Sequence, residues 1–195
     1  AERLAALVSS ETGKTATEAI PTEIAVVLDT CAWLEREAAR HLAPIDAGTS
    51  QLFFFGRRHR LVFEPLGVVG LISPFNYPLP IASAGVLFNL VAGNGIVWKP
   101  ASLTPLVAEA FREILLDAGI PADLVRIVHG GAHVGEALVT APGIAKVFFT
   151  GSEPVGRRVM ELAAAAPIAP RPVVLELGGK DAMLVLADAD LDRAA

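Results

Sequence analysis

The chain has 195 residues, 53% of them hydrophobic, which is enough for one large domain with a substantial buried core. Its net charge of −5 argues against a nucleic-acid partner, because phosphate binding needs a basic surface. Cys31 is the single cysteine, which excludes a disulfide framework and a thiolate metal cluster and fits a reducing, cytoplasmic location.

The N-terminal part of the chain is predicted to be helical. Apolar side chains recur at helical spacing from Ala16 to Leu42, and Pro44 ends that helix. Cys31 lies on the apolar stripe, so we expect it to be a small buried core residue. Because the chain has no initiator Met and opens inside an amphipathic pattern, we expect further residues upstream of Ala1.

Two strand-like runs, 52–55 and 61–63, flank the basic cluster 57–60 and predict a hairpin with a solvated edge. From Pro65 to Trp98 there is then no charged residue and no histidine. A membrane span needs about 20 continuous apolar residues, whereas prolines, asparagines and glycines interrupt this run throughout. We therefore interpret it as strand, loop, buried helix and strand, and expect no membrane association.

Short apolar strands alternate with helical segments from Val68 onwards. Strands are predicted at 68–72, 96–99, 125–128, 146–149, 173–177 and 182–186, and helices at 80–90, 104–118, 133–139 and 154–165. This alternation predicts an α/β fold with a Rossmann-like, doubly wound parallel sheet. In such sheets ligands bind beyond the carboxyl ends of the strands.

Four polar motifs lie at predicted strand ends. SPFNYP holds Asn76 in a proline-stiffened loop, where its side-chain NH₂ could donate to an oxyanion or only complete a turn. WKPAS puts Lys99 within reach of ribose hydroxyls or phosphate, or of water alone. TGSEPVG brings a glycine and a hydroxyl to a helix N-terminus, which makes an anion site. In LELGGK, burial would raise the pKa of Glu176 and suit it to general-base catalysis, unless it pairs with a nearby cation.

Other nucleotide and metal motifs do not fit. Arginines at 157–158 stand where a Walker A loop requires Lys and Ser or Thr, and the GNG run at 93–95 lacks the third glycine of G-x-G-x-x-G. His129 and His133 are four residues apart, but glycines interrupt the helix that a metal pair would need. We therefore expect no metal site.

In this order and spacing, the motifs SPFNYP, WKPAS-x-TP, FFTGSEPVG and LELGGK closely resemble those of the aldehyde dehydrogenase superfamily. The resemblance extends to the ETGK…EA opening, the EPLGVVG strand and the closing DADLDRAA, and so covers nearly the whole chain. It implies an oxidoreductase that converts a small-molecule aldehyde to a carboxylic acid with NAD or NADP through a cysteine thioester, as a homodimer or homotetramer. The implied parts are an N-terminal helical part of the cofactor domain (1–51), a hairpin of the oligomerisation region (52–65) and a dinucleotide-binding domain (66–195), without the catalytic domain.

The resemblance also implies a role for each matching position. Asn76 would stabilise the thiohemiacetal oxyanion, and Glu176 would activate the water that hydrolyses the thioester. Lys99 would bind the adenosine ribose. The remaining implied cofactor positions are Ser73, Pro74, Phe75, Ser102, Gly151, Ser152, Gly156, Leu177 and Gly178.

Two departures from the family pattern matter. Ser102 stands where the family usually has a Glu that accepts from the ribose 2′-hydroxyl, so a carboxylate that would repel a 2′-phosphate is missing. We expect NADP to be tolerated, and the preference between NAD and NADP stays open.

The family's nucleophilic cysteine lies beyond the general base, in a segment that these residues do not include, and Cys31 on its upstream helix cannot replace it. The 195 residues alone are therefore expected to be inactive as an aldehyde oxidiser.

Three alternatives stay open. A truncated or split product would keep the nucleotide-binding fold without catalysis. A related acyl-phosphate-forming semialdehyde reductase shares the nucleophilic cysteine but needs no water-activating base, so Glu176 argues against it. A phosphate-binding protein of another class would rest on residues 151–156 alone. Which aldehyde is the substrate is not readable from these residues.

Overall fold

The computed structural model describes residues 1–48, 56–166 and 170–194. Its helices are α1 (Glu2–Thr12), α2 (Ala16–Ala19), the π-helix η1 (Ile20–Ile24), α3 (Ala25–Leu42), α4 (Pro80–Val91), α5 (Pro105–Asp117), α6 (Ala132–Thr140), α7 (Glu153–Ala164) and α8 (Leu191–Ala194). Its strands are β1 (Ile45–Ala47), β2 (His59–Leu61), β3 (Val68–Ile72), β4 (Gly95–Lys99), β5 (Val125–Ile127), β6 (Ile144–Thr150) and β7 (Val173–Glu176).

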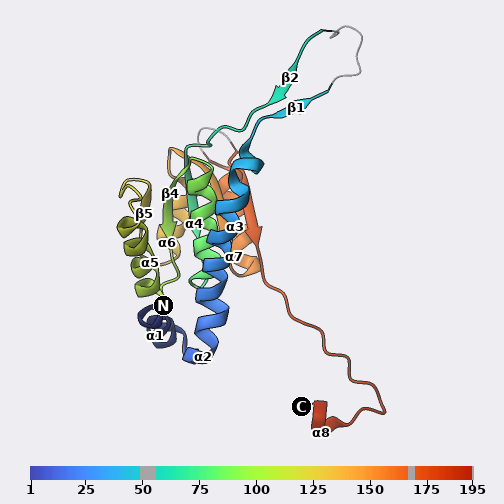
Figure 1. Cartoon of the computed structure of the whole chain (residues 1–195). Helices are drawn as coiled ribbons and strands as arrows, with labels where there is room; N and C mark the ends of the chain where they lie inside the picture. Colours follow the sequence, from blue (N-terminus) through green and yellow to red (C-terminus); the bar gives the residue numbers. More distant parts are fainter. Residues whose placement is uncertain (49–55, 167–169, 195) are drawn as a thin grey trace.

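The main sheet has five parallel strands in the order β5-β4-β3-β6-β7. Helices α4 and α5 pack on one face of this sheet, and α6 and α7 pack on the other (Figure 1). The chain enters at the central strand β3, winds out to β5, and then winds the other way through β6 to β7. The prediction of a doubly wound α/β fold is confirmed, and the switch point lies between β3 and β6.

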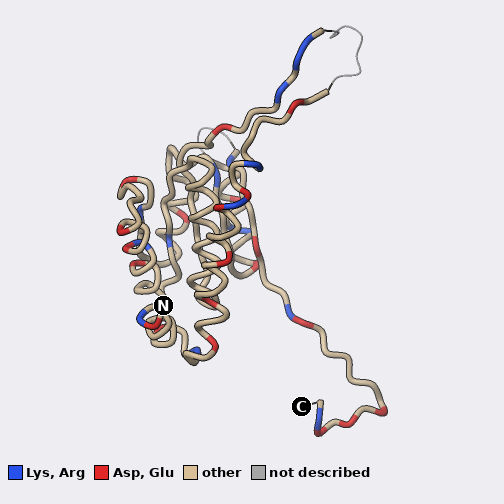
Figure 2. The backbone as a smooth tube through the Cα atoms, in the orientation of Figure 1, with Lys and Arg blue, Asp and Glu red and all other residues tan. Residues whose placement is uncertain are grey.

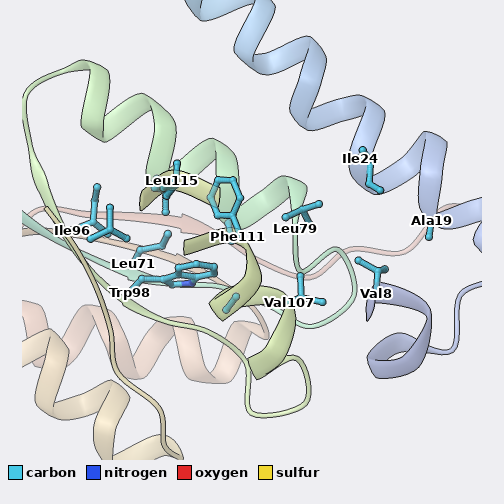
Figure 3. Packing of buried hydrophobic residues seen from close by; sticks show 14 of the residues in the cluster. Val8, Ala19, Ile24, Leu71, Leu79, Ile96, Trp98, Val107, Phe111 and Leu115 are labelled. Carbon is cyan, nitrogen blue, oxygen red and sulfur yellow. The ribbon is translucent and has the colours of Figure 1, made fainter. Parts of the chain in front are cut away.

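The buried strands divide their side chains between two hydrophobic clusters. On one face Leu71, Ile96 and Trp98 pack with α1, α4 and α5. The indole of Trp98 meets the ring of Phe111 edge-on, with 6.3 Å between ring centroids (Figure 3). On the other face Phe149 and its neighbours pack with α6 and α7. Both faces of β3 and β4 are covered, which explains why these strands are continuous apolar runs.

The charge-free run forms β3, α4 and β4, as predicted. Helix α4 lies directly on the sheet at Gly85, where a Cβ would come within 2.9 Å of the Leu71 side chain. Within the described ranges, no helix combines the length and the apolar character needed to cross a membrane.

A π-helix interrupts the N-terminal helix that was predicted to be continuous. Pro21 has no N–H to donate to the preceding turn, and the N–H of Ala25 bonds to the carbonyl of Ile20, five residues back. The extra residue in this turn places Glu23 and Ile24 side by side in the interior, and the Glu23 side chain is fully buried.

Cys31 is exposed, so the prediction that it is a buried core residue is wrong. Helix α3 packs against α4 and η1. Within its apolar stripe Leu34 is buried, whereas Leu28 is 63% exposed. Hydrophobic spacing identifies a helix face, but the extent of the neighbouring surface decides how much of that face is covered.

A hairpin of β1 and β2 projects from the body, with Ile45 opposite Leu61 (Figure 1). The predicted strand 52–55 lies outside the described residues. Among the described residues, β2 pairs with β1. Arg60 donates to Asp46 across the pair at 2.9 Å, within an arm that carries several basic residues (Figure 2).

The predicted strand at 182–186 is wrong. This segment leaves the sheet after β7 and runs as an extended tail to α8 (Figure 1). Its apolar residues are exposed, with Leu184 at 90%. A strand needs a hydrogen-bonding partner as well as an apolar run, and no described residue supplies one here.

Helix α5 is capped by a residue distant in the sequence. The carboxylate of Glu11 in α1 accepts the N–H groups of Leu106 at 2.9 Å and Val107 at 2.8 Å, while the side chain of Thr104 makes no cap bond.

We expect Glu11→Ala to lower the free energy of unfolding by about 1–2 kcal/mol, because two first-turn donors and the helix dipole lose their acceptor. Urea unfolding measures this, and a loss no larger than that of Glu2→Ala at the start of α1 would contradict it.

Candidate functional site

The four sequence motifs meet at one edge of the parallel sheet. Ser73 follows β3, Lys99 ends β4, Gly151 follows β6 and Glu176 ends β7. The N–H of Ser73 donates to the carbonyl of Lys99 at 3.2 Å, and the N–H of Gly151 donates to the carbonyl of Glu176 at 3.0 Å. The structure thus brings the predicted positions together at the carboxyl ends of neighbouring strands, on both sides of the switch point.

Lys99 is buried at the end of β4. Its ammonium donates to the carbonyl of Pro100 at 3.1 Å. Desolvation lowers the pKa of Lys99, because burial penalises the charged form. Ser102, in the loop that follows, is exposed and donates to the carbonyl of Gly130 at 3.2 Å.

A pocket of about 310 Å³ lies beside Lys99, between α6 and α7. Its walls are mainly apolar and are formed by Ile72, Phe149, Val155, Val159 and Leu162 among others. At its rim Arg158 donates to Glu136 at 2.9 Å, which ties α7 to α6 and raises the pKa of the guanidinium above its usual value. The pocket thus places the ammonium of Lys99 beside a mainly apolar slot between two helices.

Sequence reasoning missed the residues of α6 and α7 that line this pocket. Val155, Val159 and Leu162 recur at positions i, i+4 and i+7 of α7. That spacing is the same as the spacing of a core-facing stripe, so it carries no separate signal for a ligand pocket.

Helix α7 begins at this edge of the sheet, and two glycines near its start allow close packing. A Cβ at Gly151 would come within 2.6 Å of the Phe149 ring, and a Cβ at Gly156 within 2.4 Å of the Leu177 side chain. Ser152 is the N-cap residue, and its side chain makes no cap hydrogen bond. The helix N-terminus therefore offers its positive end and its first-turn N–H groups to an anion at the sheet edge.

Asn76 lies exposed in the loop between β3 and α4, after Pro74 and Phe75. The indole N–H of Trp98 donates to Ser73 Oγ at 2.9 Å, and the ammonium of Lys14 donates to the Asn76 carbonyl at 2.7 Å. The first bond holds the side chain of Ser73 at the start of the loop, the second holds the backbone at Asn76, and Asn76 itself is exposed. The bond from Lys14 was not expected from the sequence.

Glu176 is exposed, so the predicted burial of this carboxylate is wrong. Strand β7 is at the edge of the sheet, and among the described residues no helix covers β6 and β7 on the α4 side. An apolar pocket of about 570 Å³ opens there, lined by Phe148, Val174 and Glu176 among others. Leu177 and Gly178 follow in the exposed chain. The desolvation argument for a general base at Glu176 does not hold in this structure.

His129 bonds to Glu109, with 2.7 Å between Nε2 and Oε1. Across ranges 1–48, 56–166 and 170–194, no group of three or more His, Cys, Asp or Glu side chains is arranged to hold a metal ion.

The chain is similar to known proteins along its whole length. A model of the aldehyde dehydrogenase family matches residues 1–195. The chain is 43% identical to a 4,4′-diapolycopene aldehyde oxidase of Methylomonas sp., over 100% of this chain and 36% of that protein. It therefore spans about a third of that relative's length.

Solved structures give the same result. A structure described as an E. coli NADP dependent enzyme has a TM-score of 0.84 at 34% identity, over 99% of this chain and 39% of its own. An aldehyde dehydrogenase of Brucella melitensis biovar abortus 2308 has a TM-score of 0.84 at 34% identity, over 99% and 38%. With four strand-end motifs on a doubly wound sheet and a family match along its whole length, the chain belongs to the aldehyde dehydrogenase family.

Proposed function

We propose that the chain forms the cofactor-binding part of an NAD(P)-dependent aldehyde dehydrogenase, which oxidises an aldehyde to a carboxylic acid through a cysteine thioester. The observation that carries this proposal is the convergence of the four motifs at the switch point, beside the pocket between α6 and α7. The names of two relatives support it, since one is an aldehyde oxidase and the other an NADP dependent enzyme.

The residues present fit a dinucleotide. The apolar slot between α6 and α7 suits the flat faces of an adenine, and Lys99 at its edge can donate to ribose hydroxyls. The N-terminus of α7, after Gly151 and Ser152, suits the pyrophosphate. A bound nicotinamide supplies the hydride acceptor, and the chain supplies its position and its electrostatic surroundings.

Asn76 and Glu176 act on the substrate carbon in this proposal. The nucleophilic thiolate comes from outside the 195 residues. The side-chain amide of Asn76 donates to the aldehyde oxygen as that oxygen gains negative charge. Glu176 then removes a proton from the water that attacks the thioester. The second step distinguishes an aldehyde dehydrogenase from an acyl-phosphate-forming reductase, which needs no such base.

The test uses the full-length protein with NAD⁺ or NADP⁺ and a panel of aldehydes. We expect reduced cofactor and free carboxylic acid in equal amounts, and we expect Lys99→Met to weaken cofactor binding in calorimetric titrations. An acyl phosphate formed only in the presence of phosphate would instead favour the semialdehyde reductase. Cofactor binding without oxidation of any aldehyde would favour a binding module.

Cofactor choice is expected to depend on Ser102. A carboxylate at this position would face the 2′-phosphate of NADP, so we expect Ser102→Glu to weaken NADP⁺ binding by about tenfold or more, since each 1.4 kcal/mol of repulsion is a factor of ten. NAD⁺ binding should change by about twofold or less. Titration calorimetry with both cofactors measures this, and Ser102→Gln is the neutral control of matching size. Equal losses for NAD⁺ and NADP⁺ would rule the idea out.

We also propose that the protein forms dimers or tetramers through the β1–β2 hairpin. The hairpin extends away from the body and exposes apolar side chains, with Ile45 at 52% and Leu61 at 53%. A patch of this kind on a projecting arm is typical of an interface.

A cytoplasmic location stays a prediction from the single cysteine.

A further inference from the structure

Lys14 and Glu23 form a buried ion pair beneath the loop that carries Asn76. The Glu23 side chain is 0% exposed and that of Lys14 is 12% exposed. One carboxylate oxygen of Glu23 accepts from the Lys14 ammonium, and the other accepts the N–H of Leu79 at 3.1 Å. The Lys14 ammonium also donates to the Asn76 carbonyl at 2.7 Å and lies 3.7 Å from the centroid of the Tyr77 ring.

This pair holds the loop at two points, at Asn76 and at Leu79. Burying two charges costs free energy unless both are paired and hydrogen-bonded, and here the additional partners are the backbone groups of this loop. Pro74, Pro78 and Pro80 have no N–H group, so the loop has few donors with which to bond to itself. Its conformation therefore depends on bonds supplied from outside.

Both residues of the ion pair lie in irregular turns of the N-terminal region. Glu23 lies in the π-helix η1, and the extra residue of that turn directs its carboxylate into the interior. Single π-turns inside helices are frequent at functional sites. Lys14 lies between α1 and α2, directly after Gly13, whose φ of 78° ends α1 in the left-handed conformation. Both charged groups thus come from irregular turns of the N-terminal helices.

We propose that Lys14 and Glu23 are positioning residues that set the direction in which the Asn76 amide donates to the oxyanion. The inference rests on the proposed role of Asn76. Lys14 bonds the backbone carbonyl of Asn76 and leaves its side-chain amide free to act. Oxyanion stabilisation depends strongly on donor geometry, and a displacement of about 1 Å can cost on the order of 10²-fold in rate.

The first test compares kcat of the full-length protein with kcat of Lys14→Met, which keeps the apolar stem and removes the ammonium. We expect a loss of about 10–100-fold, with the dissociation constant of the cofactor changed by about twofold or less. Lys14→Arg should recover part of the loss, because it restores a cation. Glu11→Gln is the matched control, a carboxylate that caps α5 without contacting the loop, and should leave kcat nearly unchanged. Equal losses in Lys14→Met and Glu11→Gln would overturn the proposal.

A double-mutant cycle shows whether Lys14 acts through Asn76. If it does, Lys14→Met should cost little once Asn76→Ala has removed the donor, because neighbouring residues with a shared function are not additive. If Lys14 only stabilises the fold, the two losses will multiply, and the positioning role is excluded.

Hydrogen exchange separates this inference from the proposed function, because it needs no activity. We expect the amide hydrogen of Leu79, which is bonded to Glu23, to exchange faster in Lys14→Met and in Lys14→Met/Glu23→Gln, and to be unaffected in Glu11→Gln. The double variant also covers the case in which Glu23→Gln alone leaves a buried lysine unpaired and does not fold. Should the wild type oxidise no aldehyde, the proposed function fails while exchange still reports on the loop. Unchanged exchange in an active enzyme would overturn the anchoring itself.

Discussion

Replacing Asn76 by Ala in the full-length protein is expected to lower kcat by about 10²–10³-fold, the usual effect of removing one oxyanion donor. Asn76 is exposed in the loop after β3, and the pocket between α6 and α7 does not include it. We therefore expect the cofactor dissociation constant to stay nearly the same. Loss in kcat without loss in binding is the pattern of a group that acts only in the transition state.

Steady-state kinetics with saturating cofactor measure the effect, and Asn76→Asp is the informative companion. Asp has the size of Asn but no NH₂ group, and its charge opposes a developing oxyanion, so its activity should be no higher than that of Asn76→Ala. If Asn76→Asp retained most of the wild-type kcat, or if Asn76→Ala lost less than about threefold, the donor would have to be another group.

Trp98→Ala is expected to have the largest effect on stability, lowering the free energy of unfolding by about 3–5 kcal/mol. Trp98 is 1% exposed and packs against Phe111 in the cluster under α5 (Figure 3). Its indole N–H is also the donor to Ser73 Oγ. The substitution therefore creates a cavity and removes a buried hydrogen bond where the Asn76 loop begins.

Urea unfolding followed by fluorescence or circular dichroism measures this change. Trp98→Phe separates the two contributions, because it keeps most of the apolar volume and removes only the donor, which we expect to cost about 1–3 kcal/mol. Phe111→Leu is a control in the same cluster that leaves Ser73 bonded. A loss below about 1 kcal/mol in Trp98→Ala would mean that the cluster repacks around the cavity.

The order of strands and helices could be predicted from local sequence. Strand β3 runs from Val68 to Ile72, as predicted, because a strand buried on both faces is a short apolar run. Helix α5 starts at Pro105 and is followed by Gly119 with a φ of 90°, the two residue types that mark helix ends. The grouping of the motifs at one edge then followed from topology, since parallel strands share their carboxyl edge.

Burial could not be predicted in the same way. Cys31 and Glu176 were both expected to be buried, and both are exposed. Cys31 has helical spacing and Glu176 follows an apolar strand, but burial depends on what packs against a residue from outside its own element. The run 182–186 shows the same limit, because its apolar pattern does not supply a neighbouring strand.

Sequence alone was sufficient to identify the strand-end motifs, the parallel sheet that joins them and the family that carries them. Only the tertiary structure showed how the motifs are held. Lys14 and Asn76 are separated by 62 residues, and Glu11 and Leu106 by 95. The slot beside Lys99 is lined by two helices, and their apolar residues recur with the same sequence spacing as in any helix that faces a core. The period of a helix or a strand fixes which residues of one element share a face. Contacts between residues far apart in the sequence depend instead on how the elements pack in the folded chain.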